Sequence, residues 1–455
     1  MKTDMKSEIQ NLKSEIHTNR CLLSCALVAL SLATLPAGAW EVATNLTVKA
    51  ELSAKEAYDS NVYLQDHEPD TDAVPRAVRP DQESFVTSVT PKLSLDWKPC
   101  TAFSAAVSYA PEVTFYHAES SEDYVAHRGA INLRGEVGDV PWEMPHSITF
   151  IDGNRQGLYY GVSSLPGRLD GVPAIGGIPV RDRREQFVYR GGFKATWSLG
   201  AFFVRPVLAA YVHDFQTKQK PNGRLLPDGA PNPDWGYENY VDRSALNYGL
   251  DVGWSVHART KLYAGYRYGN EFEGTMVGSP YRYDAQVHRP LVGIEGKPVS
   301  WLTADVSIGP DIHNTTSRHD PAFDPDYTAL WADAVLTLTP TAKDSIALIW
   351  RQNTQPAFSS PSVYEDTVYE GTVRHRFDDQ WSVGGGFRAY LGDWHDPVIR
   401  RDWIFTPSAS VTYRHDAHLS AEVSYSYDWV DSRVPDTKGR EFTRHLAWLA
   451  VKYAF

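Results

Sequence analysis

The chain has 455 residues, of which 42% are hydrophobic and 12% aromatic, and its formal net charge is −12. This charge argues against a nucleic-acid partner, because no basic field is present to attract phosphates. The mean hydropathy is −0.39, and apart from one run near the N-terminus no long apolar segment occurs. A helical membrane protein is therefore excluded.

The N-terminal segment predicts export. After a charged start, Cys21–Leu35 is an apolar run of roughly 15 residues, shorter than the ~20 that a membrane-spanning helix needs. Ala37-Gly38-Ala39 follows, in the small-x-small pattern of a signal-peptidase site. We expect residues 1–39 to be an N-terminal extension and cleaved signal peptide, and residues 40–455 to form the mature barrel domain.

Cleavage near Ala39 would also remove two of the three cysteines. Cys21 and Cys25 lie in the predicted signal peptide, which leaves Cys100 alone. We therefore expect no intramolecular disulfide and no cysteine-based metal site.

From Trp40 onward the sequence repeats one unit: an alternating run, a short turn, a second alternating run and a long polar loop. Short turns are predicted at Lys98–Ala102, Gly138–Pro145, Leu199–Ala201, His257–Lys261, Gly296–Ser300, Pro340–Asp344, Asp378–Gln380 and Arg414–His418. Long loops are predicted at Asp66–Gln82, His117–Asp123, Tyr160–Asp182, Gln216–Asn239, Asn270–Arg282, Gly309–Asp326, Thr354–Val363, Leu391–Asp402 and Val430–Arg440.

These connections join about eighteen strands (16–18), with both termini on the short-turn side. Alternating short and long connections are typical of a transmembrane barrel, with tight periplasmic turns and longer outer loops. The sequence thus predicts an all-β, antiparallel up-and-down transmembrane barrel with periplasmic N- and C-termini. A barrel of about this size leaves an aqueous channel.

Period-two alternation supports this fold. In Asn247–His257 and Leu419–Trp429, apolar and aromatic residues occupy one face and small or polar residues the other. A soluble β-sandwich also alternates, but here Arg and Glu stand in mid-strand on the polar faces. Tryptophans cluster beside the turns, as in an interfacial belt: Trp97, Trp197, Trp254, Trp301 and Trp381.

The polar faces are expected to line the pore. Opposing rows of arginines and carboxylates would orient polar solutes and set ion preference. Alternatively, inward ion pairs only hold the wall together. The arginines outnumber nearby acids in the middle strands, which predicts a weak anion preference. The predicted lining residues are Arg128, Arg134, Arg190, Lys194, Arg205, Arg267, Arg351, Arg374, Arg376, Arg388, Glu112, Asp251, Asp305 and Glu370.

The C-terminal strand has its own signature, with one face that carries Ala447, Leu449, Val451, Tyr453 and Phe455. A last strand that ends in an aromatic residue resembles the closing strand of Gram-negative outer-membrane β-barrels. In that family this strand is the assembly signal. The resemblance implies an outer-membrane location, with lipid and the barrel-assembly machinery as partners.

The segment Glu56–Leu64 reads Glu-Ala-Tyr-Asp-Ser-Asn-Val-Tyr-Leu. It resembles the Tyr-Asp-(Ser/Asp)-Asn-(aliphatic)-aromatic opening of a family of putative β-barrel porins, some of which are encoded with exopolysaccharide-export genes. We predict passive diffusion of small polar solutes, and the resemblance implies glycan export as the alternative.

A barrel hydrolase that acts on lipid is the remaining hypothesis. Catalysis needs a nucleophile, a base and an orienting group held together. Neither Gly-x-Ser-x-Gly nor His-Glu-x-x-His occurs in the sequence. We predict no catalytic residues, no cofactor and no bound metal.

Overall fold

The computed structural model describes residues 40–43, 45–64, 83–154, 184–216, 241–275, 280–322, 324–356, 363–395, 399–433 and 441–455. The predicted signal peptide with its cleavage site lies outside these residues, as do the predicted loops Asp66–Gln82 and Tyr160–Asp182 and most of Gln216–Asn239. The boundary between residues 39 and 40 stays a prediction.

The described residues are nearly all strand. The strands are β1 (Trp40–Ala43), β2 (Leu46–Asp59), β3 (Ser84–Cys100), β4 (Phe103–Tyr116), β5 (Tyr124–Val137), β6 (Val140–Asn154), β7 (Arg184–Ala195), β8 (Trp197–Leu199), β9 (Phe202–Phe215), β10 (Arg243–His257), β11 (Thr260–Glu273), β12 (Ala285–Val299), β13 (Leu302–Thr315), β14 (Tyr327–Leu338), β15 (Asp344–Pro356), β16 (Val363–Arg376), β17 (Trp381–Trp394), β18 (Arg400–Arg414), β19 (Leu419–Arg433) and β20 (Thr443–Ala454). A 3-10 turn, Ser120–Glu122, lies between β4 and β5. Among these residues no helix is long and apolar enough to cross a membrane.

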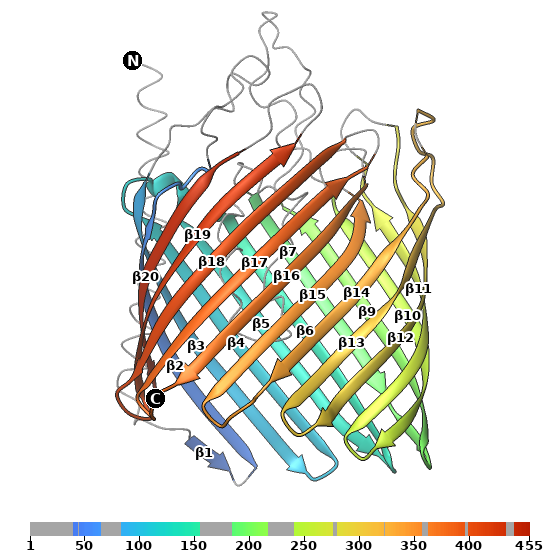
Figure 1. Ribbon diagram of the computed structural model, residues 1–455, viewed down its shortest axis with the longest axis horizontal. Helices are drawn as coiled ribbons and strands as arrows, with labels where there is room; N and C mark the ends of the chain where they lie inside the picture. The colour runs from blue at the N-terminus through green and yellow to red at the C-terminus, as the bar shows by residue number, and fades with distance from the viewer. Residues whose placement is uncertain are drawn as a thin grey trace, which may run out of the picture.

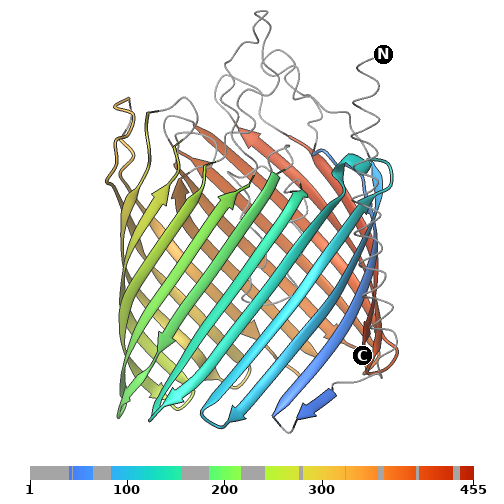
Figure 2. The ribbon, with the colours of Figure 1, turned by 180° about the vertical axis from the view of Figure 1, so that it is seen from behind.

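The strands form one closed antiparallel barrel (Figures 1 and 2). Each strand pairs with its sequence neighbours, and β2 pairs with both β3 and β20, which closes the sheet. β7 and β8 both pair with β9, so they form one interrupted wall strand. The wall therefore has eighteen strands, which confirms the predicted antiparallel barrel and its strand number. β1 adds a short antiparallel pairing to β2.

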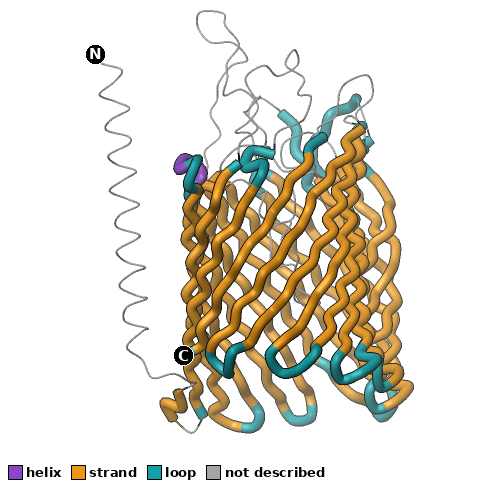
Figure 3. Tube along the Cα trace, turned by 60° about the vertical axis from the view of Figure 1, so that its left-hand side comes forward, coloured by secondary structure: helices purple, strands orange, loops and turns teal. Residues whose placement is uncertain are grey.

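The short turns gather at one end of the barrel and the long connections at the other (Figure 3). The C-terminus lies at the short-turn end (Figure 1). Five of the short turns have only two residues. Two of these five use a glycine with positive φ, Gly138 at 61° and Gly200 at 67°. A side chain is strained in that conformation, so glycine permits these turns.

Several predicted connections are too long, and in two of them prolines lie within strands. β6 begins at Val140, so Pro141 and Pro145 of the predicted turn are strand residues. β13 continues to Thr315, so the predicted loop beginning at Gly309 starts after that residue instead. Both errors arose because proline lacks the N–H that a central strand normally donates, and each of these segments contains proline.

The two faces of the wall differ as the alternation predicts. On β10, Tyr248, Leu250, Val252 and Trp254 are all exposed, and they lie on the outer face. The inner face is polar. Arg205 on β9 contacts Glu295 on β12 at 2.6 Å, although three strand spacings of about 4.8 Å separate these strands. Side chains bridge such a span only on the concave side of the sheet.

The outer face carries two bands of polar-tipped aromatics. The tryptophans predicted for a belt lie at the short-turn end. Nearer the long loops, tyrosine hydroxyls contact histidine rings of neighbouring strands, as in Tyr109–His127 (2.7 Å) and Tyr425–His445 (2.7 Å). His127 lies ten residues before the end of β5, which is ~25 Å along the axis for a tilted strand. This spacing matches the apolar band of an outer-membrane barrel.

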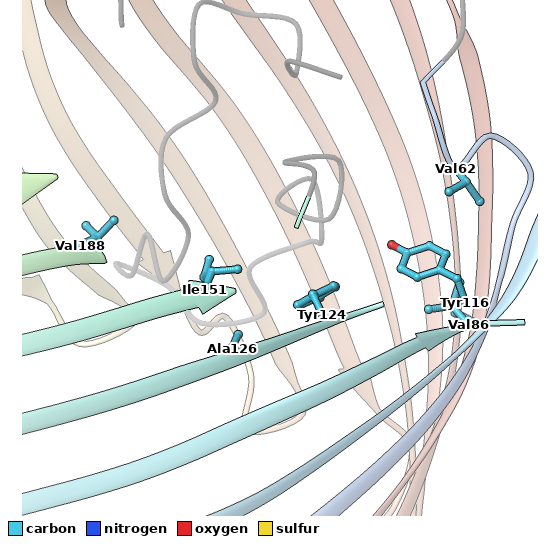
Figure 4. Packing of buried hydrophobic residues seen from close by; sticks show 8 residues of the cluster. Val62, Val86, Tyr116, Tyr124, Ala126, Ile151 and Val188 are labelled. Carbon is cyan, nitrogen blue, oxygen red and sulfur yellow. The ribbon is translucent and has the colours of Figure 1, made fainter. Parts of the chain in front are cut away.

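One apolar cluster lies on the inner face. It joins β2 to β7 near the long-loop end and includes Val86, Tyr116, Ala126, Ile151 and Val188. Figure 4 shows these side chains on the face of the strands that looks toward the opposite wall. Inside the barrel, therefore, the long-loop end holds a buried apolar group as well as charges.

Candidate pore lining

All fourteen predicted lining residues lie on the inward-facing positions of their strands, opposite in phase to the exposed apolar residues. They do not form one continuous row. Most are joined to carboxylates in separate groups along the wall. That they line a conducting path stays a prediction.

The tightest of these groups joins β9, β10, β11 and β12. Asp251, which is fully buried, accepts hydrogen bonds from Arg205 (2.9 Å) and Arg267 (2.6 Å). Arg205 also contacts Glu295, and its guanidinium lies 4.8 Å from the ring centre of Tyr263. Gly265 leaves the room for this group, because a Cβ there would lie 2.2 Å from the Asp251 carboxylate.

A second group, on β12 to β14, was not predicted. Arg289 donates two hydrogen bonds, 2.9 and 2.8 Å, to the Asp311 carboxylate, and its guanidinium lies over the Trp331 ring. The His313 ring lies 3.1 Å from the same carboxylate and stacks on Tyr327. The alternation could have revealed this group, because Asp311 and His313 continue the inward phase of Asp305. Both residues were instead assigned to the predicted loop that begins at Gly309.

A third group spans the seam where β20 meets β2. Arg444 donates two hydrogen bonds, 2.8 and 2.6 Å, to Asp59, and all of these atoms are buried. Asp428 on β19 lies 3.9 Å away on the other side of the guanidinium. The opposing carboxylates hold Arg444 across the closing strand pair.

The segment that resembles the porin family lies at this seam. Asp59 makes the ion pair with Arg444, the backbone N–H of Asn61 donates to Asp59, and the Asn61 amide donates to the Thr443 carbonyl. Ser60 exchanges two hydrogen bonds with the backbone of His445. The conspicuous polar residues of the segment therefore tie β2 to β20.

The other paired residues form two-strand or three-strand contacts. Glu143 contacts Arg134 at 2.8 Å and Lys194 at 3.2 Å. The remaining pairs are Arg128–Glu112 at 2.5 Å, Arg351–Asp333 at 3.1 Å and Arg388–Glu370 at 3.3 Å. These contacts match the alternative in which inward ion pairs hold the wall together.

Four predicted lining residues have no ion pair within the part of the chain that the structure describes. Arg190 lies over the Tyr211 ring, 5.3 Å from its centre. Arg374 donates to the hydroxyls of Ser382 and Thr412, and Arg376 donates to the Ala342 carbonyl. Asp305 is the fourth. Three of these four are cationic, so this subset of the predicted lining carries a net positive charge.

Exposure divides the inner wall along the barrel axis. Near the short turns the charged side chains are open to water, and 63% of the Arg134 side chain is exposed. Near the long loops they are buried, and 2% of Arg444 is exposed. Arg205 is an exception, since it lies beside the rings of Phe203 and Tyr263. The charged side chains of the inner wall are thus mostly exposed at the short-turn end and mostly buried toward the long-loop end.

The predicted assembly residues end the closing strand. Leu449, Val451 and Tyr453 are exposed on the outer face, and Ala447 shares their phase. Phe455 lies just beyond β20 and is only 8% exposed, so it is not open to lipid like the others. Its ring packs edge-on against Tyr453, and its N–H donates to the Ala50 carbonyl at 2.9 Å.

No family model and no curated protein matches the chain. Several solved structures resemble it in fold. The outer membrane protein OpdK from Pseudomonas aeruginosa is 10% identical with a TM-score of 0.41, over 90% of this chain and 99% of that one. OpdQ from the same organism is 9% identical with a TM-score of 0.41, over 90% and 97%. The siderophore receptor PiuA from Acinetobacter baumannii is 8% identical with a TM-score of 0.45, over 91% and 82%. At these identities and scores the likeness carries no information on function.

Proposed function

We propose that the chain is an outer-membrane channel through which small polar solutes diffuse, with a weak preference for anions. The observation that carries the proposal is the contrast between the two faces of a closed eighteen-strand wall. The outer face is apolar between two aromatic bands, while the inner face is charged. An open sheet edge is not tolerated in hydrocarbon, and closure removes it.

The orientation follows from the connections. Outer-membrane barrels have short periplasmic turns and longer extracellular loops. The short-turn end, which carries β1 and the C-terminus, is therefore proposed to face the periplasm. The barrel-assembly machinery would then receive the exposed row Leu449, Val451 and Tyr453 as the assembly signal.

The burial of charged side chains at the long-loop end bears on the expected conductance. An unobstructed barrel of about eighteen strands encloses a wide aqueous channel. Here the inner wall at the long-loop end is buried, including Asp59, Asp311 and Arg444. We expect a conductance well below that of an unobstructed barrel of this size.

The test is a planar-bilayer recording on the chain purified from outer membranes. Discrete, small current steps, with a reversal potential in a KCl gradient that indicates anions, are expected. A chain that folds as a heat-modifiable barrel and yet gives no steps would refute passive diffusion.

The described residues do not favour glycan export as a second function. The segment that suggested it, Glu56–Leu64, makes seam contacts through Asp59, Ser60 and Asn61. Such contacts explain these polar residues by barrel closure, without a glycan. The hydrolase hypothesis likewise gains no support from the ion-pair groups of the wall.

A further inference from the structure

A cavity of about 750 Å³ lies at the short-turn end, between the turns β12–β13, β14–β15 and β16–β17 and the adjoining ends of β16, β17 and β18. Four cationic side chains line it: Lys343, Arg374, Arg376 and Arg414. Three carboxylates line it as well: Asp344, Asp378 and Asp379. Despite these near-equal numbers, the cations and the carboxylates do not pair with one another.

The cations are held by neutral groups. Arg374 donates to the Ser382 and Thr412 hydroxyls, Arg376 to the Ala342 carbonyl, and Lys343 to the Phe377 carbonyl. Among the described residues, the Arg414 guanidinium has no hydrogen bond or ion pair, although the Arg414 backbone N–H donates to Gln380. Glu422 acts on Arg374 electrostatically but does not form an ion pair with it.

Two of the carboxylates are engaged elsewhere. Asp344 accepts from Thr341 and contacts the His375 ring at 2.7 Å. Asp378 accepts from the backbone N–H groups of Gln380 and Trp381, which lower the pKa of Asp378 below its usual value. Both carboxylates are therefore satisfied without the arginines, and Asp379 is the remaining acid of the cavity.

The three arginines are close enough to act on one ligand. Arg374 and Arg376 share the inner face of β16. Arg376 is registered opposite Ser382, which is opposite Thr412, two residues before Arg414. Two strand spacings of about 4.8 Å thus separate the outer members, and long arginine side chains converge over such a span.

We propose that this cavity is a binding site for oxyanions, in which Arg374, Arg376 and Arg414 hold the carboxylate or phosphate groups of a small solute. Guanidinium groups bind both kinds of oxyanion through paired, charge-assisted hydrogen bonds. The exposed position of these arginines leaves them open to a ligand from the short-turn end. The inference deepens the proposed function, on which it rests for the ligand's route.

The test is isothermal titration calorimetry on the folded, detergent-solubilised chain, with citrate as the carboxylate probe and inorganic phosphate as the phosphate probe. Saturable binding of at least one is expected, and which probe binds more tightly identifies the ligand's source. Replacing the three arginines with Gln should weaken binding by about tenfold or more, because three charge-assisted contacts are lost. Lysine at all three positions should give an intermediate affinity, since the charge remains but the planar fork does not.

A charge-matched control is available at the opposite end. Arg282, Arg401 and Arg433 are exposed and each contacts an aspartate. Their triple Gln variant should bind the probes as the wild type does. If the cavity variant fails to fold, R414Q alone suffices, because the side chain of Arg414 holds nothing in the described structure.

Absence of saturable binding to the wild type, or equal binding by the cavity variant, would overturn the site. Binding without bilayer conductance would sustain the site and refute passive diffusion. Conductance without binding would sustain passive diffusion and refute the site. The two proposals can therefore be refuted independently.

Discussion

Inward-facing charged side chains are stabilised differently at the two ends of the lumen. Toward the long loops, many inward charges are buried in ion pairs, as in Arg444 with Asp59 and Arg289 with Asp311. Toward the short turns, Arg374, Arg376 and Arg414 are exposed, and the first two are held by hydroxyls and a carbonyl. A charge that is buried must be paired, whereas an exposed one is free to meet a ligand.

The buried ion pairs and the exposed cavity arginines therefore lie at opposite ends of the barrel axis, and we assign a structural role to the first and a role in transport to the second. The paired, buried end includes the seam, where mispairing would open the barrel. The exposed end has the cavity. Ion pairing thus accounts for the charges of the buried end, whereas solute selection at the exposed end is our proposal.

The largest effect is expected from breaking a buried pair. R444A leaves Asp59 buried without its partner, and loss of one member of such a pair destabilises by about 3–5 kcal/mol. R134A, at the open end, should cost less than about 1 kcal/mol, since exposed pairs contribute little. Urea unfolding of the two variants in lipid measures both changes. Equal losses would remove the distinction between the ends.

The next effect compares the inner and outer faces at one height. V423R places a charge on the lipid face and should cost about 2–4 kcal/mol near the bilayer midplane. E422R, one residue earlier on the inner face, should be much milder. Gly249 is unsuitable as an inner-face control, because a Cβ there would lie 2.1 Å from the Tyr266 carbonyl oxygen. Similar unfolding midpoints for V423R and E422R would contradict the assignment of the faces.

These comparisons also show which features of the fold can be predicted from local sequence patterns. Alternation and the spacing of the turns predicted about eighteen strands and the phase of the fourteen lining residues, because both depend on neighbours within about ten residues along the chain. The Arg444–Asp59 pair joins residues 385 positions apart. It follows from the register in which β20 meets β2, which no local pattern encodes.

The solvent exposure of the inward arginines could not be predicted from the sequence either. Arg134 and Arg444 are both inward arginines on alternating strands, yet one is open and the other buried. The difference depends on contacts between distant parts of the chain, such as the pair that Arg444 makes with Asp59. The strand beyond Gly309 was missed for a local reason. Pro310 is paired with Leu330, and a Cβ at Gly309 would lie 2.0 Å from the Pro290 carbonyl oxygen, so glycine allows two proline-bearing strands to approach.

A smaller effect is expected at the short-turn end of the seam. Deleting Phe455 removes one hydrogen bond to Ala50 and one aromatic contact with Tyr453, together about 1–3 kcal/mol. Outer-membrane assembly should fall, with less heat-modifiable barrel in membranes and more degraded chain. F455Y, which keeps the ring, is the control. Normal accumulation after deletion would contradict the assembly-signal prediction.

The smallest effect separates paired from unpaired arginines in ion selectivity. R374Q removes a positive charge that has no ion pair among the described residues, so the reversal potential in a KCl gradient should move toward cation preference. Removing both members of a pair, in R388Q with E370Q, leaves the net charge unchanged and should leave that potential nearly unchanged. At ~0.1 M salt, charges beyond about 10 Å are screened, so even the R374Q shift should be modest. A strongly cation-selective wild type would mean that the unpaired arginines do not govern the ion path.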